Sequence, residues 1–336
     1  MSMSNPTDVA DVVEQLVTND VGGRATIGTI REAAVQEQGR TPAMQAAKLL
    51  ADSVKAGDDV VILTGFVIPP TMEPETDGPP GAVSLARALD AGLNANPVIA
   101  CDPNAMETCK TTATAGGLSV QKRRSARESA RSVAVEAFPA DRGAAETCAE
   151  DLLSLDPAAV VAVEKVGPNQ AGVYHNMAGY DVSEETSKVD ELYARLDDVP
   201  AIAVGDAGNE IGMGVVEDRV RKDIEYGATC QCDCGDGIAC TISTDVLVPA
   251  AVSNWGANGI VTCLGHLLDR QLLHEPSVEH RMLVEGAMAG AVDGIGGGTT
   301  GWCDGLPTDV HEAVVRLLRE VPSASVHDRG GGELTR

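Results

Sequence analysis

The segment DVVILTGFVIPPTMEPETDGPPGAVSLARALDAGLNANPVIAC, residues 59–101, contains the pattern that decides the fold. It begins with an unbroken apolar run at 59–64, which is typical of a strand buried on both faces of a parallel sheet. A proline-rich loop follows, and residues 81–89 then have the apolar spacing of a helix. A second short apolar run at 97–101 completes a strand–helix–strand unit, so the segment predicts an α/β fold.

The same alternation continues along the chain. Further strands are expected at 133–138, 159–166, 201–204 and 239–243. Helices are expected at 144–153, 187–196, 259–268, 278–292 and 308–321. Apolar strands separated by helices predict a mostly parallel sheet with helices on both faces, in Rossmann-like layers.

We divide the chain into three parts. Residues 1–56 are expected to form an N-terminal helical lead-in, with helices near 9–17 and 44–54 and a glycine-containing stretch between them. Residues 57–322 are the α/β catalytic domain, and residues 323–336 are a flexible tail.

The chain is strongly acidic, with 50 Asp and Glu against 25 Lys and Arg and a formal net charge of -25. This charge disfavours nucleic acid and anionic membranes as partners. It suits a halophilic protein that works in concentrated salt, where repulsion between like charges is screened. We favour this explanation over an acidic substrate or a role in cation storage.

No secretion signal is evident, and no apolar run approaches the roughly 18 to 20 residues of a membrane helix. We therefore expect a cytoplasmic protein. The nine cysteines are then expected to be reduced thiols rather than a disulfide framework. The sequence leaves open whether the chain forms a homo-oligomer.

Acidic residues follow most of the expected strands. Ligands of open α/β sheets bind at the carboxyl ends of the strands, so these residues are expected to meet at one edge. They are Glu73, Glu75 and Asp77, then Asp102, Glu164, Asp206, Glu210 and Asp245. Gathered carboxylates need protons or a hard cation, and oxygen ligands without histidine favour Mg²⁺ or Mn²⁺ over Zn²⁺. Alternatively, each acid only caps a helix or faces solvent.

Familiar cofactor and nucleophile motifs are absent. The stretch GDAGNEIGMG at 205–214 is neither a dinucleotide fingerprint nor a P-loop, so we expect no nicotinamide or flavin. The chain also lacks a G-x-S-x-G elbow and the H-E-x-x-H motif, and its histidines show no paired metal spacing. Serine–histidine chemistry is therefore not indicated.

A cluster of thiols lies at Cys230, Cys232, Cys234 and Cys240. Four thiols this close in sequence can bind Zn²⁺ or an iron–sulfur cluster, but the C-x-C-x-C spacing lacks the C-x₂-C knuckles of common zinc sites. A loop insertion with free thiols is the simpler expectation.

Several long strings resemble the D-glutamate cyclase family, between about residues 20 and 322. They are LTGFVIPPTMEPETDGPPGAVSLARAL at 63–89, EKVGPNQAGVYHNMAGYDVSE at 164–184, GDAGNEIGMG at 205–214, STDVLVPAAVSNWGANGI at 243–260 and DGLPTDVHEAVVRLL at 304–318. The chain departs from the family pattern at Ala178, Ala207 and the 230–234 stretch. Its acidic composition resembles that of a haloarchaeal-type member of the family.

The resemblance implies a hydro-lyase that cyclises D-glutamate, or a related amino acid, to 5-oxo-D-proline with loss of water. We expect Glu164, Asp206 and Glu210 to be catalytic, with Glu164 as the base that deprotonates the amine. A divalent cation, Mn²⁺ or Mg²⁺, is expected to polarise the γ-carboxylate. Its expected ligands are Glu75, Asp77, Asp206, Glu210 and Asp245, and the expected substrate contacts are Thr64, Gly65, Lys165, Asn176, Gly208, Asn209 and Asn254.

Two other functions fit the same acidic loops. A phosphoesterase also uses Mg²⁺ or Mn²⁺ held by carboxylates, and a noncatalytic sensor of a metabolite or nucleotide can share the fold. The residues alone do not separate these from a cyclase.

Overall fold

The computed structural model describes residues 9–326, with side chains up to Val321, and is built around a parallel sheet of seven strands. The strand order is β5-β6-β4-β1-β7-β8-β9, and every neighbouring pair is parallel. The strands are β1 Asp59–Thr64, β4 Asn96–Cys101, β5 Ser119–Gln121, β6 Ser132–Ala137, β7 Ala159–Val163, β8 Ala201–Gly205 and β9 Val246–Pro249. The predicted α/β class is confirmed.

The chain changes its direction of travel across the sheet between β1 and β7. After β1 it continues to β4 on one side, and after β7 it continues to β8 and β9 on the other. The loops that leave β1 and β7 therefore diverge. Such a switch point at the carboxyl ends of the strands is where open α/β sheets bind their ligands.

Helices cover both faces of the sheet, because successive strand side chains point to opposite faces. Val60 and Ile62 of β1 belong to one core, and Val61 and Leu63 belong to the other. The first core includes residues of α1 Val9–Val17, α3 Pro42–Ser53, α4 Pro79–Ala88, α5 Met106–Ala115, α10 Ser253–Leu267, α11 Pro276–Met288 and α12 Thr308–Val326. The second includes residues of α2 Thr26–Gln38, α7 Arg142–Leu153, α8 Asp190–Tyr193 and α9 Glu217–Asp223.

Short elements complete the fold. They are the antiparallel pair β2 Val67–Ile68 and β3 Glu73–Pro74, the π-helix η1 Leu89–Leu93, the 3₁₀ helices η2 Pro103–Ala105 and η3 Gly214–Val216, and α6 Arg123–Ala126.

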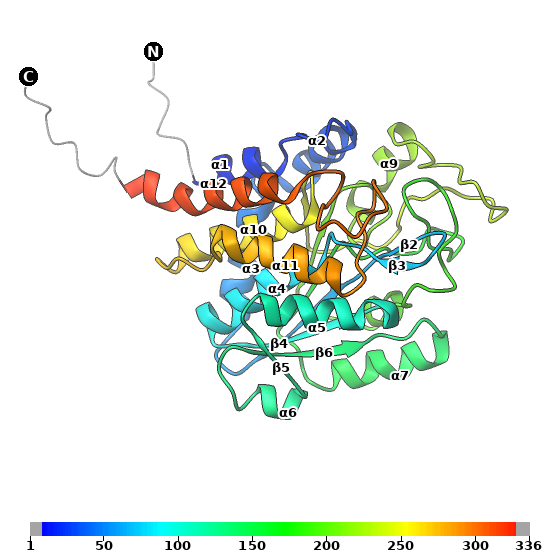
Figure 1. Ribbon diagram of the computed structural model, residues 1–336. Coiled ribbons are helices and arrows are strands. Elements are labelled where there is room, and N and C mark those ends of the chain that lie inside the picture. The colour runs from blue at the N-terminus through cyan, green and yellow to red at the C-terminus, as the bar shows by residue number, and fades with distance from the viewer. Residues whose placement is uncertain (1–8, 327–336) are drawn as a thin grey trace, which may run out of the picture.

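The N-terminal helices pack closely on α10. In Figure 1, α1, α10 and α12 lie together on one side of the molecule. A Cβ atom at Gly259 of α10 would lie 2.9 Å from Cγ1 of Val17 and 3.1 Å from Cγ1 of Val13. Gly259 therefore lets α1 approach α10, so the helical lead-in shares the main core.

Most predicted elements are confirmed, and three are not. The strand expected at 239–243 is wrong, because β9 begins at Val246. Ala239 and Cys240 are buried for another reason: a Cβ at Gly167 would lie 2.4 Å from Cys240 Sγ, so this part of the segment packs under the loop after β7. The helix expected at 187–196 is shorter in the structure, where α8 spans only Asp190–Tyr193. Much of the stretch expected to lie between the two N-terminal helices forms α2. The predicted tail at 323–336 overlaps α12, which extends to Val326. The rest of the predicted tail lies outside the described residues.

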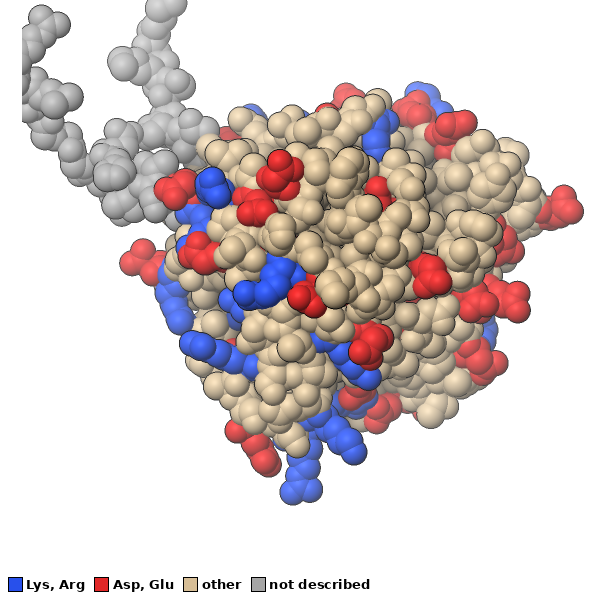
Figure 2. Space-filling view, in the orientation of Figure 1, with Lys and Arg blue, Asp and Glu red and all other residues tan. Residues whose placement is uncertain are grey.

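Figure 2 shows acidic and basic side chains interspersed over one face. Among the described residues, no helix is both long enough and apolar enough to span a membrane.

The fit of α1 on α10 predicts opposite effects for two glycine-to-alanine substitutions. Gly259→Ala should lower the free energy of unfolding by about 1–3 kcal/mol, because the added methyl overpacks α1 against α10. Gly28→Ala should raise it by about 0.4–1 kcal/mol, because Gly28 is exposed in α2 and no atom lies within 4 Å of the new methyl. Urea unfolding of both variants measures the difference, and equal effects would contradict the packing.

Candidate functional site

Three carboxylates that follow different strands meet at the switch point. Asp77 lies in the loop after β1, Glu164 directly follows β7, and Asp206 directly follows β8. One carboxylate oxygen from each lies within 4.8 Å of the others, and all three residues are buried. The predicted convergence of these acids on one edge of the sheet is confirmed.

Asp77 is fixed by the N-terminus of α10. Its Oδ2 accepts the backbone N–H of Ser253 at 2.8 Å, and its Oδ1 accepts those of Asn254 at 2.8 Å and Gly78 at 3.0 Å. A helix N-terminus favours a negative charge because its first N–H groups have no partner within the helix. The same backbone that begins α10 therefore sets the position of this carboxylate.

Glu164 is turned toward the site by an unusual backbone conformation. Its φ angle is 46°, in the left-handed region that side-chain-bearing residues rarely adopt. Its Oε2 accepts the hydroxyl of Ser253 at 2.6 Å, so Ser253 contacts both Asp77 and Glu164. Strain of this kind, held in place by the surrounding structure, is common at functional sites.

Asp206 pairs with an arginine from the N-terminal region. Its Oδ2 lies 2.5 Å from Nη2 of Arg24, in the connection between α1 and α2. The same nitrogen lies 3.0 Å from Oδ2 of Asp304 and also donates to the carbonyl of Ala251. Burial acts to lower the pKa of Arg24, but the charges of Asp206 and Asp304 outweigh it and raise the pKa. Arg24 thus remains charged between the two acids.

Glu210 organises the loop that carries Asp206. Its Oε1 accepts the backbone N–H groups of Asp206 and Ala207, each at 2.7 Å, and its Oε2 accepts that of Gly208 at 2.7 Å. Both oxygens are therefore occupied by the backbone. Glu210 therefore acts as a positioning residue for this loop, and its expected roles as a metal ligand and catalytic group stay predictions.

Glu75 directly follows β3 and lies close enough to Asp77 and Asp206 for their charges to act on it. A Cβ at Gly294 would lie 1.8 Å from Oε1 of Glu75, so a side chain there would displace the Glu75 carboxylate. Burial, followed by the charges of Asp77 and Asp206, raises the pKa of Glu75 well above its ordinary value.

The site holds more negative charge than its one guanidinium can balance. Burial raises the pKa of Glu164 and Asp304 well above the ordinary range, with the charges of neighbouring carboxylates adding to it. Burial and then the charge of Asp206 raise the pKa of Asp77 and Glu210 to about 7. Such a set must be partly protonated or must bind a cation, because isolated buried carboxylates are costly.

The structure separates Asp245 from the other predicted ligands. Asp245 precedes β9, and its Oδ2 accepts the backbone N–H of Ala201, the first residue of β8, at 2.8 Å. It therefore lies at the amino edge of the sheet, opposite Asp206. The prediction failed because it rested on the misplaced strand at 239–243.

Two of the predicted substrate contacts have other partners. Lys165 is fully buried, and its ammonium group donates to the carbonyl of Gly65, to Ser187 and to its ion-pair partner Asp102. Asn254 accepts backbone N–H groups of Gly78 at 3.1 Å and Gly81 at 2.7 Å. Both side chains thus hold loops in place, and their contact with the substrate stays a prediction.

The remaining predicted contacts divide into two groups. The amide oxygen of Asn176 accepts the backbone N–H of Tyr180 at 3.0 Å and closes a turn, and Gly208 donates to Glu210. Thr64 Oγ1 and Asn209 Oδ1, in contrast, are buried without a hydrogen-bond partner among the described residues. A Cβ at Gly78 would lie 2.7 Å from Thr64 Oγ1 and 3.0 Å from Cβ of Glu164, so this hydroxyl lies beside the carboxylates.

Sequence reasoning missed three residues of the site: Arg24, Ser253 and Asp304. Arg24 had no signal, because its contact with Asp206 joins positions 182 residues apart. Ser253 and Asp304 lie within the segments 243–260 and 304–318, which resemble the family. The sequence therefore contained a signal for both residues, but no role was assigned to them.

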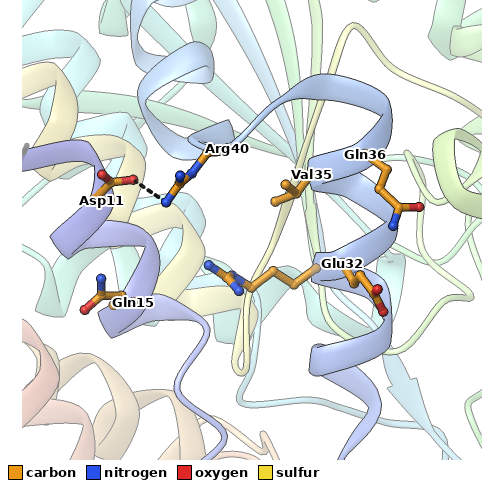
Figure 3. A pocket seen from close by; sticks show the side chains of 7 residues that line it. Asp11, Gln15, Glu32, Val35, Gln36 and Arg40 are labelled. Atoms are coloured by element: carbon orange, nitrogen blue, oxygen red, sulfur yellow. Dashed lines mark ion pairs between the residues drawn. The ribbon is translucent and has the colours of Figure 1, made fainter.

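A surface hollow between α1 and α2 shares no residue with this site. Figure 3 shows the side chains that line it, with an ion pair of 3.9 Å between Asp11 and Arg40 at one side. The lining is polar and contains no cluster of reactive groups.

Comparison with known proteins agrees with the resemblance seen in the sequence. The pattern of the family described as "D-glutamate cyclase-like, C-terminal" matches residues 13–319. The chain is also 30% identical over 311 residues to the Homo sapiens protein named "D-glutamate cyclase, mitochondrial". This alignment covers 82% of the chain and 47% of the human protein, so the chain spans about half the length of that relative.

The raised pKa values predict that stability falls as pH rises. Burial raises the pKa of Asp77 to about 7 in the folded state, whereas the pKa of an aspartate in the unfolded chain is near 3.8. The folded state therefore holds extra protons between about pH 4 and 7, and the free energy of unfolding should decrease across that interval. Urea unfolding in concentrated salt with chelator tests this, since salt screens the general charge repulsion.

Glu14 provides the control for this titration. It is buried outside the site, and burial raises its pKa to about 7. Glu14→Gln should remove only part of the slope. A stability that rises with pH over this interval, or a slope abolished by Glu14→Gln, would contradict the assignment to the site.

Proposed function

Because the chain belongs to the D-glutamate cyclase-like family, we propose that it is a hydro-lyase that converts D-glutamate to 5-oxo-D-proline and water. The observation that supports this proposal is the meeting of Asp77, Glu164 and Asp206 at the switch point of the sheet. Buried carboxylates attract the α-ammonium group of an amino acid, which is the group that must lose a proton in the cyclisation. A phosphoesterase would use the same carboxylates through a bound Mg²⁺ or Mn²⁺, so it is kept as the alternative.

The reaction joins two ends of one molecule. The amine nitrogen of D-glutamate attacks its own γ-carboxyl carbon, a C–N bond forms, and one carboxylate oxygen leaves as water after taking up protons. The entropic cost of bringing the groups together is low once the substrate is folded into a ring-closing pose. The barrier lies in removing a proton from the ammonium group and in activating a carboxylate.

Glu164 has the properties expected of the base. Its pKa lies well above the ordinary value because of burial and the surrounding charges, so its carboxylate takes up a proton more readily than an exposed glutamate does. The hydroxyl of Ser253 and the left-handed backbone fix its direction. The proton that it accepts from the ammonium group can then pass to the departing oxygen.

Asp77 and Asp206 are the residues that would hold a divalent cation. Their hard oxygen donors suit Mn²⁺ or Mg²⁺, and the excess negative charge around Arg24 calls for a cation. A divalent ion at this position would polarise the γ-carboxylate and lower the energy of its oxyanion. Asp77 keeps its position through the backbone of α10, and Asp206 through Arg24 and the loop organised by Glu210.

We further propose that the helical lead-in at 1–56 is part of the catalytic unit. This segment supplies Arg24, which pairs with both Asp206 and Asp304. Asp304 lies in a loop near the C-terminal end of the chain. Without Arg24, two buried carboxylates would face each other unpaired, which is strongly destabilising.

Separate variants distinguish the base from the cation ligands. Glu164→Gln should reduce kcat by roughly 10²–10⁴-fold while Mn²⁺ binding is retained. Asp206→Asn should abolish both, and Asp245→Asn, at the opposite edge, should leave both unchanged. Formation of 5-oxoproline from D- or L-glutamate in concentrated salt measures turnover, and isothermal titration calorimetry measures Mn²⁺ binding.

The same assay separates the alternatives. Full activity of the wild type in excess chelator would exclude the cation, and phosphate release from a generic phosphate ester would favour a phosphoesterase. Tight binding of glutamate without product would indicate a sensor. Equal losses in Asp206→Asn and Asp245→Asn would contradict the placement of the site.

Arg24 provides an independent test of the lead-in. Arg24→Lys keeps the charge but cannot reach Asp206, Asp304 and the carbonyl of Ala251 together, so kcat/KM should fall by about 10–100-fold. Arg31→Lys, an exposed position on α2, serves as the matched control and should have wild-type activity. An Arg24→Lys enzyme as active as the control would remove Arg24 from the catalytic unit.

A further inference from the structure

Three thiols and one imidazole converge outside the carboxylate site. Sγ of Cys230 lies 3.3 Å from Sγ of Cys232 and 3.4 Å from Sγ of Cys234. Nε2 of His175, from a distant part of the chain, lies 3.3 Å from Sγ of Cys232 and 3.8 Å from Sγ of Cys234. All four atoms lie within 4.8 Å of one another.

Cys240, grouped with these thiols from its place in the sequence, does not belong to the set. It is fully buried under Gly167. His175 takes the fourth position instead, and its spacing of more than fifty residues from the thiols explains why no sequence motif revealed it. The C-x-C-x-C spacing of the three thiols still differs from common zinc motifs, but the fourth ligand comes from His175 rather than Cys240.

We propose that His175, Cys230, Cys232 and Cys234 bind one Zn²⁺ ion in a tetrahedral site. Zinc bonds of about 2.3 Å to sulfur and about 2.0 Å to nitrogen give a tetrahedron with edges of roughly 3.5–3.8 Å. Four of the six ligand-atom separations are 3.3–3.8 Å, so they require only small shifts to reach those edges, and the other two lie within 4.8 Å. Thiolate and imidazole ligands select zinc over the hard cations that suit the carboxylates.

The surrounding backbone supports a bound ion. Residues 224–245 contain no helix or strand, and loops of this length usually need another source of order. Backbone hydrogen bonds close the loop at its base, from Ile238 to Tyr226 and from Cys230 to Asp236, each at 2.9 Å. A metal that joins this loop to His175 would fix its tip as well.

A side chain beside the ligands also fits such a site. The amide of Asn169 donates to Sγ of Cys234 at 3.5 Å and to the carbonyl of Gly237 at 2.8 Å. Donors to a thiolate sulfur orient it and offset its charge in metal sites.

All four positions of the tetrahedron are filled by protein, which is typical of a structural rather than a catalytic zinc. The site nevertheless adjoins the proposed active site. The carbonyl of His175 accepts the amide of Asn209 at 2.8 Å, and Asn209 lies in the loop between Asp206 and Glu210. The zinc would therefore support the back of the loop that carries Asp206, independently of the reaction proposed above.

Zinc content of the full chain tests the proposal. Protein purified under reducing conditions should contain about one zinc per chain by plasma mass spectrometry. Cys232→Ser and His175→Ala should lower this to less than about a tenth, whereas His175→Cys should restore it by completing a four-thiolate set. Cys148→Ser, at a half-buried thiol of α7, is the matched control and should keep the wild-type content.

A second measurement does not depend on folding of the variants. Replacement of zinc by Co²⁺ in the wild type should give the intense visible absorption of tetrahedral cobalt together with thiolate charge-transfer bands. Three thiols should become reactive on addition of a strong chelator. Wild-type protein without zinc, an iron chromophore in its place, or a disulfide within 230–234 under reducing conditions would each overturn the zinc assignment.

Discussion

The site depends on one carboxylate at the N-terminus of α10. Asp77 accepts backbone N–H groups from Ser253 and Asn254, and this contact joins the loop after β1 to the helix that packs across the sheet. Because the partners are backbone groups, the position of Asp77 is as rigid as the helix itself. Ser253 then extends the same arrangement to Glu164, so two of the three central acids share one anchor.

Burial gives these acids their chemistry. An exposed carboxylate at neutral pH is a weak base, whereas burial raises the pKa of Asp77 to about 7 and that of Glu164 well above its ordinary value. The cost of gathering them is offset in part by Arg24 and by the N–H groups that surround Asp77 and Glu210. The negative charge that these groups leave uncompensated lets the site take up a proton or a cation. The proposed cyclisation requires this property.

The chain separates two kinds of ligand chemistry. Oxygen donors meet at the ends of β1, β7 and β8, while sulfur and imidazole donors meet behind the loop that follows β8. A hard cation would prefer the first group and a soft one the second, so one protein can hold both without competition. Asn209 lies between the two groups, with its amide on the backbone of His175.

The sequence alone determined the α/β class, the bounds of β1 and the edge at which Asp77, Glu164 and Asp206 meet. These follow from local apolar runs and from the parallel direction of the strands, which the residue pattern records directly. Only the tertiary structure excluded Asp245, brought in Arg24 and replaced Cys240 by His175. Those outcomes depend on which distant loops become neighbours, and contacts between residues far apart in the chain have no local periodicity from which to infer them.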